Sequence, residues 1–168
     1  DSAGLIYHLP KRDGACWRKE ECCYVYGVPS FRTKRKTEEL LPDFMEKNKP
    51  TPDPALFNIF VFHGALDIPS LKPPYMEAEI SPELIPEGFN YYAAGHIHKP
   101  YKEEFKKGLL VYSGSIETVN YDEVKNEKGF YYVRVDENGN VNPQFIKLES
   151  TRKFLVLEQD FTGMTPSK

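Results

Sequence analysis

The 168-residue sequence contains no long hydrophobic run, few cysteines and no excess of positive charge. No stretch approaches the roughly 20 apolar residues that a membrane-spanning helix needs, and no signal-peptide pattern is visible. The formal net charge is −3, so any contact with DNA would depend on a local patch or on metal ions. We therefore predict a cytoplasmic protein that has no membrane partner.

The three cysteines are clustered at positions 16, 22 and 23. Adjacent residues of a strand point to opposite faces, so Cys22 and Cys23 are poorly placed to bind one metal ion. We expect buried thiols in a reducing compartment. A Cys16–Cys22 disulfide or a thiolate site is the alternative.

The composition is that of a folded domain, with 40% hydrophobic and 14% aromatic residues. The spacing of apolar residues predicts one helix, at 36–48, and a larger number of strands. An Asn-Gly pair at 138–139 predicts a hairpin turn. We therefore predict an α/β fold that is mostly sheet with few helices. The predicted strands lie at 4–9, 21–27, 57–62, 90–94, 109–112, 129–135, 141–148 and 154–157.

Three of the four histidines lie at the ends of predicted apolar strands. His63 follows one such strand, and His96 and His98 follow the next. In an extended backbone the side chains at i and i+2 point to the same side, so the last two imidazoles would share one small volume. Because ligands bind at the strand ends of open α/β sheets, we predict a metal site made by these three histidines. His8 lies inside a predicted strand without a partner motif and is interpreted as structural.

Three segments, taken in order, resemble the calcineurin-like metallophosphoesterases. They are residues 60–64, 95–98 and 112–117, and the second is a Gly-His-x-His motif. The flanking residues 91–99 and 128–133 are similar to those of the double-strand-break repair nucleases of the SbcD and meiotic-recombination-eleven type, archaeal members in particular.

This resemblance implies a position for the chain in such a nuclease and an activity for the intact protein. Residues 1–149 would form the carboxyl-terminal half of the nuclease domain, a partial metallophosphoesterase sandwich, and residues 150–168 would begin a capping domain. The intact protein would be a manganese-dependent exonuclease and endonuclease that acts at DNA ends. Its partner would be an SMC-like coiled-coil ATPase of the SbcC type, and in a prokaryote it would be associated with the nucleoid.

The resemblance also implies a centre of two metal ions, usually Mn²⁺, that share a bridging aspartate. His63 and His96 would bind one ion and His98 the other. Three imidazoles alone would also accept Zn²⁺ or Ni²⁺. Two such cations activate a water and neutralise charge on an in-line phosphodiester.

Four further residues are predicted to contact the substrate phosphate. Lys99 and Tyr101 closely follow the histidine pair, and Ser113 and Ser115 flank a glycine turn after the next predicted strand. Three carboxylates are predicted to orient the imidazoles, and the alternative is that they are ordinary surface groups. They are Asp67, Glu117 and Asp122.

The chain departs from the family at its first metal ligands. Those ligands come from Asp-x-His, Gly-Asp and Gly-Asn-His-Asp motifs upstream of the matching region, and no Asp-x-His occurs in this sequence. Without the bridging carboxylate, two neighbouring cations repel each other strongly. The sequence also begins with Asp1 rather than methionine. We therefore expect a fragment of a longer protein that is inactive by itself, exposes an apolar face and forms a homodimer.

Two alternatives remain. The intact protein would be another calcineurin-like phosphodiesterase or phosphatase, which acts on small molecules, or the chain would be a stand-alone module with a three-histidine metal site. Zinc held by three histidines and a water is a known arrangement. That module requires His63 to lie within ligand distance of both His96 and His98.

Overall fold

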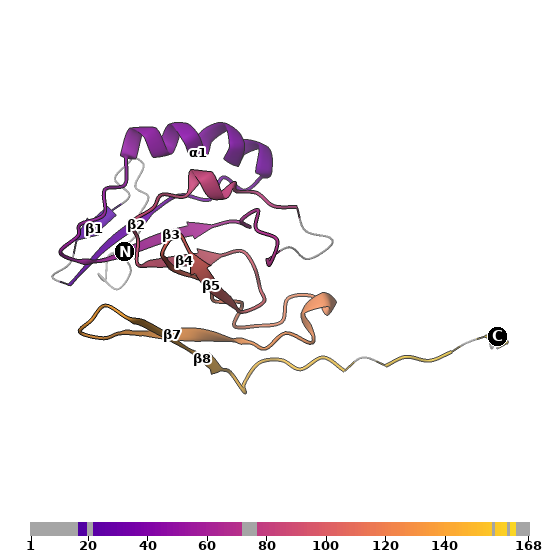
Figure 1. Cartoon of the computed structure of the whole chain (residues 1–168). Helices are drawn as coiled ribbons and strands as arrows, with labels where there is room; N and C mark the ends of the chain where they lie inside the picture. The colour runs from indigo at the N-terminus through magenta and orange to yellow at the C-terminus, as the bar shows by residue number, and fades with distance from the viewer. Residues whose placement is uncertain (1–16, 20–21, 72–76, 156, 161, 164–168) are drawn as a thin grey trace, which may run out of the picture.

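In the described part of the chain, one α-helix, a six-stranded sheet and a two-stranded sheet form three layers (Figure 1). The predicted α/β class is therefore confirmed. The predicted strand at 4–9, with His8, and the first cysteine, Cys16, lie outside the described residues. The computed structural model describes residues 17–19, 22–71, 77–155, 157–160 and 162–163.

The central sheet has six strands in the order β1-β2-β3-β4-β6-β5. The four inner strands are parallel, and the edge strands β1 and β5 are antiparallel to their neighbours. Parallel strands end at the same edge of a sheet, and the register pairs His63, the last residue of β3, with Gly95, the last residue of β4. The strands are β1 (Trp17–Lys19), β2 (Cys23–Gly27), β3 (Phe57–His63), β4 (Tyr91–Gly95), β5 (Tyr101–Phe105) and β6 (Gly108–Tyr112).

The helix α1 (Lys34–Asn48) covers one face of this sheet (Figure 1). Thr33 caps the helix, because its hydroxyl oxygen accepts a hydrogen bond from the backbone N–H of Lys36 at 3.3 Å. Leu41 of the helix joins the core that alternate residues of the inner strands form. The 3₁₀ turn η1 (Pro82–Leu84) lies beside α1. The bulkiest fully buried side chains are Tyr26, Tyr92, Tyr112, Phe60 and Phe89.

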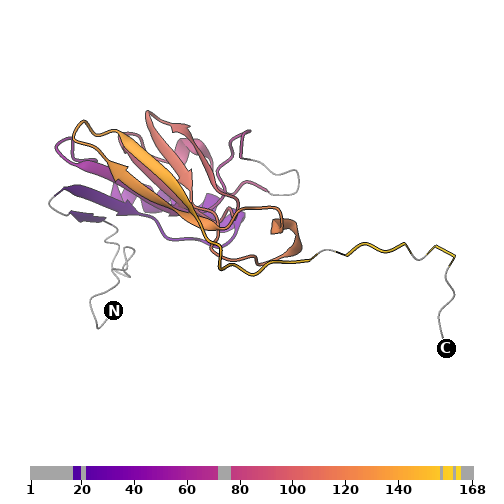
Figure 2. The same ribbon diagram turned by 90° about the horizontal axis from the view of Figure 1, so that it is seen from below.

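A two-stranded antiparallel sheet lies on the other face of the central sheet (Figures 1 and 2). Tyr131 and Phe145 are half-buried on one side of this hairpin, with ring centroids 5.3 Å apart. Phe130 and Tyr132, at the alternate positions, are 43% and 53% exposed. The hairpin therefore buries one side and leaves large apolar side chains on the other. Its strands are β7 (Gly129–Val135) and β8 (Val141–Lys147).

Most predicted elements are confirmed, and the exceptions lie at the edges of the fold. The helix begins at Lys34, two residues before the predicted start. The edge strands β1 and β5 were not predicted, because β1 has three residues and β5 is largely charged. The strand predicted at 154–157 is wrong, since its described residues are irregular. The expectation of buried thiols is also wrong for Cys22, which is an exposed free thiol.

None of the helices in the described ranges is both long enough and apolar enough to cross a bilayer.

Candidate metal centre

His63 and His96 meet at the carboxyl edge of the central sheet. His63 ends β3 and His96 directly follows β4, so the parallel pairing of the two strands brings them side by side. Their ring centroids are 5.5 Å apart, and the rings are nearly perpendicular, at 80°. Gly95 makes this approach possible, because a Cβ atom there would lie 2.7 Å from His63 Nδ1.

The backbone at His96 is not extended. β4 ends at Gly95, and His96 has a φ of 94°, in the left-handed region that is costly for a residue other than glycine. The expectation that His96 and His98 continue an extended backbone is therefore wrong, because the strand ends before the pair begins. His96 turns toward His63, whereas His98 contacts a carboxylate of another loop.

Glu79 is the acidic neighbour of the His63–His96 pair. Its Oε2 lies 3.6 Å from His96 Nε2 and accepts a hydrogen bond from the backbone N–H of Ala65 at 3.3 Å. The backbone N–H of Ile80 also donates to the Ala65 carbonyl oxygen at 3.0 Å, which holds the glutamate loop beside the end of β3. Sequence reasoning missed Glu79, because its segment is rich in proline and acidic residues and has no periodicity that would single out one carboxylate.

The turn after His63 is held by the buried Tyr112 at the end of β6. The Tyr112 hydroxyl donates a hydrogen bond to the carbonyl oxygen of Gly64 at 2.8 Å and accepts one from the backbone N–H of Leu66 at 3.1 Å. Burial raises the pKa of Tyr112 well above its usual range, so the hydroxyl stays protonated and able to donate. One side chain thus satisfies two backbone groups of the loop that positions His63.

The protonation state of His63 suits metal binding. Partial desolvation lowers the pKa of His63, and the neighbouring His96 lowers it further, against the opposing effect of Glu79. The imidazole is therefore neutral at pH 7, and the neutral ring nitrogen is the form that binds a metal ion.

The donors at this edge suit a divalent cation, since imidazole and carboxylate groups bind Mn²⁺ and Zn²⁺. However, no group of three His, Cys, Asp or Glu side chains within the described ranges is close enough to hold an ion. A self-sufficient site made by His63, His96 and His98 is therefore not supported.

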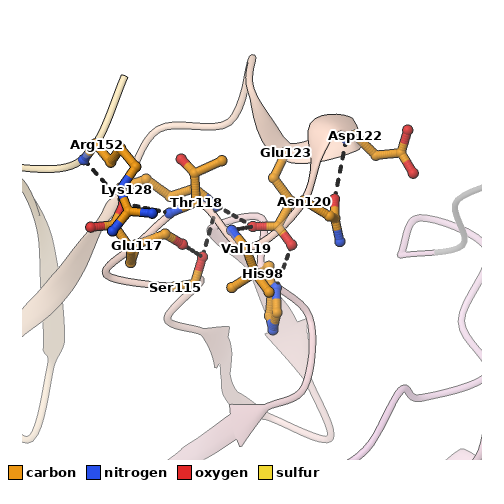
Figure 3. A network of polar contacts seen from close by, with 10 residues as sticks. All are labelled: His98, Ser115, Glu117, Thr118, Val119, Asn120, Asp122, Glu123, Lys128 and Arg152. Carbon is orange, nitrogen blue, oxygen red and sulfur yellow. Dashed lines mark hydrogen bonds and ion pairs between the residues drawn. The ribbon is translucent and has the colours of Figure 1, made fainter. Parts of the chain in front are cut away.

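His98 belongs to a second cluster, shown in Figure 3. His98 Nδ1 lies 2.6 Å from Glu123 Oε1, and Glu123 Oε2 accepts hydrogen bonds from Lys128 Nζ at 2.7 Å and from the backbone N–H of Val119 at 3.3 Å. Lys128 Nζ also donates to Ser115 Oγ at 2.7 Å. Desolvation raises the pKa of Glu123, but the hydrogen bonds from Lys128 and His98 outweigh it and lower the pKa to about 2.

The carboxylate that contacts His98 was not among those predicted. An asparagine three residues before Glu123 caps the 3₁₀ turn η2 (Tyr121–Glu123), and Glu123 is buried at the end of this turn. An asparagine followed three residues later by glutamate is the one sequence signal that would have found it. Figure 3 shows the side chain of its neighbour Asp122 pointing away from His98. The three carboxylates that were predicted are all exposed, and they are Asp67, Glu117 and Asp122.

The residues predicted to contact substrate lie in different surroundings. Lys99 and Ser113 are exposed beside the carboxyl edge. The Tyr101 hydroxyl donates its proton to the carboxylate of Glu103 on its own strand, and its oxygen lies 2.7 Å from Ser70 Oγ. Ser115 accepts the lysine hydrogen bond of the second cluster and donates to a backbone carbonyl at 2.9 Å. The Ser113 hydroxyl also donates to the backbone carbonyl oxygen of Gly114 at 3.5 Å, whereas no such contact is described for the Lys99 side chain.

No family model matches the chain, but curated proteins do. The DNA double-strand break repair protein Mre11 of Methanopyrus kandleri is 39% identical over 92% of the chain. The SbcD component of the nuclease SbcCD from Staphylococcus epidermidis is 32% identical over 44% of the chain. This chain is homologous to part of the Mre11 and SbcD proteins. The resemblance inferred from its motifs is thereby confirmed.

A third relative connects the family to the wider fold. The uncharacterized metallophosphoesterase YhaO of Bacillus subtilis is 31% identical over 54% of the chain. The matches span 36% of the length of the Methanopyrus protein, 19% of the Staphylococcus protein and 22% of YhaO. The described structure thus corresponds to one portion of a longer metallophosphoesterase relative.

Proposed function

We propose that this chain is part of a metal-dependent DNA nuclease that repairs double-strand breaks and uses Mn²⁺. The observation that carries the proposal is the packing of His63 against His96, with Glu79 beside them, in a chain homologous to Mre11. The substrate is a DNA end, and the reaction is hydrolysis of a phosphodiester by exonuclease and endonuclease cleavage.

In this proposal the residues of the chain bind and orient the metal ions. His63 and His96 would hold one ion, and His98 would hold the other through Nε2, because its Nδ1 is taken by Glu123. Bound ions of this kind supply an activated water and neutralise the charge of the phosphodiester. The exposed Lys99, next to His98, would meet a substrate phosphate.

The rest of the site would come from residues outside this chain. Among the described residues no three His, Cys, Asp or Glu side chains form a group that could hold an ion, and two cations need an anion between them. We therefore propose that a bridging carboxylate is contributed by another segment of the full-length protein and that this chain alone does not cleave DNA. The name of the Staphylococcus relative, which is one component of a nuclease called SbcCD, supports a coiled-coil ATPase of the SbcC type as the partner.

The test is a nuclease assay on the full-length protein with end-labelled duplex DNA and Mn²⁺. His96→Ala and His98→Ala should each lower the rate at least ~100-fold, because each removes a metal ligand. Glu104→Gln, on the exposed face of the edge strand β5, is the matched control and should retain full activity. Hydrolysis of small phosphodiesters without any cleavage of DNA would contradict the proposal and favour a general phosphodiesterase.

We also propose that the chain forms a homodimer through the outer side of the β7–β8 hairpin. Phe130 and Tyr132 are 43% and 53% exposed there, and neighbouring exposed apolar side chains that form one patch are typical of interaction surfaces. Light scattering should give twice the mass of the chain, and the double variant Phe130→Ser, Tyr132→Ser should be monomeric. A monodisperse wild-type monomer would contradict this proposal.

A further inference from the structure

Glu123 is a buried carboxylate with both oxygens engaged. Its side chain is 7% exposed, and Lys128, which donates to it, has a side chain that is 3% exposed. One oxygen contacts His98 Nδ1 at 2.6 Å, and the other accepts from Lys128 Nζ and from the backbone N–H of Val119 (Figure 3). The carboxylate is therefore held from two sides and is not free to rotate away from the imidazole.

This contact determines which nitrogen of His98 carries the proton. The carboxylate already accepts two hydrogen bonds on its other oxygen, one of them from an ammonium group, so it acts as an acceptor toward Nδ1 as well. Nδ1–H then donates to Glu123, and Nε2 carries the lone pair. The His98 side chain is 43% exposed, so the ring is accessible to a ligand. An imidazole that donates from one nitrogen to a carboxylate is oriented, and made more basic, for metal binding through the other.

The cluster is also tied to the second sheet. Lys128 immediately precedes β7, and its carbonyl oxygen accepts a hydrogen bond from the backbone N–H of Leu148 at 2.8 Å. The backbone N–H of Gly129, the first residue of β7, donates to the carbonyl oxygen of Ser115 at 3.2 Å. Lys128, which holds the carboxylate that contacts His98, thus also belongs to the hydrogen-bonded base of the β7–β8 hairpin.

The geometry points to Glu123 as a positioning residue that, held by Lys128, presents Nε2 of His98 to a divalent metal ion. This inference rests on the proposed function, because it takes His98 as a metal ligand. It assigns a role at the metal centre to the β6–β7 connection, a segment that has no metal-ligand motif of its own.

The first test measures the tautomer of His98 directly, without metal. Two-dimensional ¹H–¹⁵N spectra of the histidine rings, recorded above the titration range of histidine, should show Nδ1–H as the dominant form in the wild-type chain. Glu123→Ala should convert His98 to a mixture dominated by Nε2–H, which is the form of an imidazole without this partner. Asp122→Asn, a change at the neighbouring exposed carboxylate, should leave the spectrum unchanged. An Nε2–H tautomer of His98 in the wild type would overturn the inference.

Glu123→Gln replaces Glu123→Ala in this measurement if the alanine variant does not fold. A glutamine keeps the shape of the side chain but presents either an amide oxygen or an amide N–H to Nδ1. Both tautomers of His98 should then be populated. An unchanged, pure Nδ1–H signal in a folded Glu123→Gln variant would also overturn the inference.

The second test measures Mn²⁺ affinity of the full-length protein by electron paramagnetic resonance. Loss of a group that orients a metal-binding histidine weakens metal binding about 10–100-fold, so Glu123→Ala should lower the affinity by this factor. The Asp122→Asn control should bind as tightly as the wild type. If His63→Ala and His98→Ala both weaken Mn²⁺ binding while Glu123→Ala leaves it unchanged, the inference fails and the proposed function stands. If His63→Ala also leaves it unchanged, the proposed function fails.

Discussion

Replacing Lys128 by methionine removes an ammonium group from the interior and keeps the length of the side chain. Lys128 Nζ lies 2.7 Å from both Glu123 Oε2 and Ser115 Oγ, and its side chain is 3% exposed. In the variant the buried carboxylate of Glu123 loses the cation that compensates it, and only His98 and one backbone N–H still contact it. We expect the folded chain to be much less stable.

Two independent estimates of this loss of stability give a similar magnitude. Breaking a buried ion pair by removing one partner costs about 3–5 kcal/mol. The second route uses the pKa of Glu123, which is about 2 in the folded chain against an ordinary value of 4.5. Ionisation of this carboxyl therefore stabilises the folded chain by about 3 kcal/mol, and the hydrogen bond from Lys128 is the largest favourable cause. We expect Lys128→Met to lower the free energy of unfolding at pH 7 by about 3 kcal/mol.

The loss of stability caused by Lys128→Met should depend on pH in a defined direction. The folded-state pKa of Glu123 is depressed, so its contribution is fully present above the ordinary pKa of 4.5 and is lost as the pH falls toward 2. Lys128 and His98 are the charged or titratable groups that face this carboxylate. The difference in free energy of unfolding between wild type and Lys128→Met should therefore be large at pH 7 and small near the acid end of this range.

The assay is urea unfolding followed by circular dichroism at pH 7 and at about pH 3. Lys147→Met is the matched control, because Lys147 is 53% exposed and its ion pair with Glu127 should contribute about 0–1 kcal/mol. The double variant Lys128→Met, Glu123→Gln should recover much of the loss, since no unpaired charge remains buried. Equal losses for the two lysine variants, or an equal difference at both pH values, would refute this reasoning.

Three further substitutions test how the fold supports the site. Tyr112→Phe leaves two buried backbone groups without a partner and should lower the free energy of unfolding in urea by about 1–3 kcal/mol. Tyr121→Phe, at a side chain that is 73% exposed, is the control and should leave the free energy of unfolding almost unchanged. Equal losses in the two variants would contradict the role of the Tyr112 hydroxyl. Gly95→Ala places a Cβ atom 2.7 Å from His63 Nδ1, so the ring must move and metal affinity of the full-length protein should fall; unchanged affinity would show that the ring has room. Thr33→Ala removes the cap of α1 and should cost about 1 kcal/mol without changing the histidine ring spectra, which separates a general loss of stability from an effect on the site.

Local patterns were sufficient for the elements that carry the histidines. The apolar run before His63 and the run before Gly95 each predicted a strand, and the structure has β3 and β4 there. The alternation at 129–135 and 141–148 around an Asn-Gly turn predicted the hairpin that is found. The charged edge strand β5 was missed, because it pairs with a single neighbour and its sequence lacks an apolar run.

The amino-acid sequence by itself determined which residues reach the carboxyl edge of the sheet, since strand ends and the Gly-His-x-His motif are local features. Only the tertiary structure decided how these residues are used. His96 adopts a positive φ that brings it to His63, and Glu123 reaches His98 across 25 positions of the chain. Such contacts join loops whose course depends on the packing of two sheets, and no periodicity in either segment records that packing.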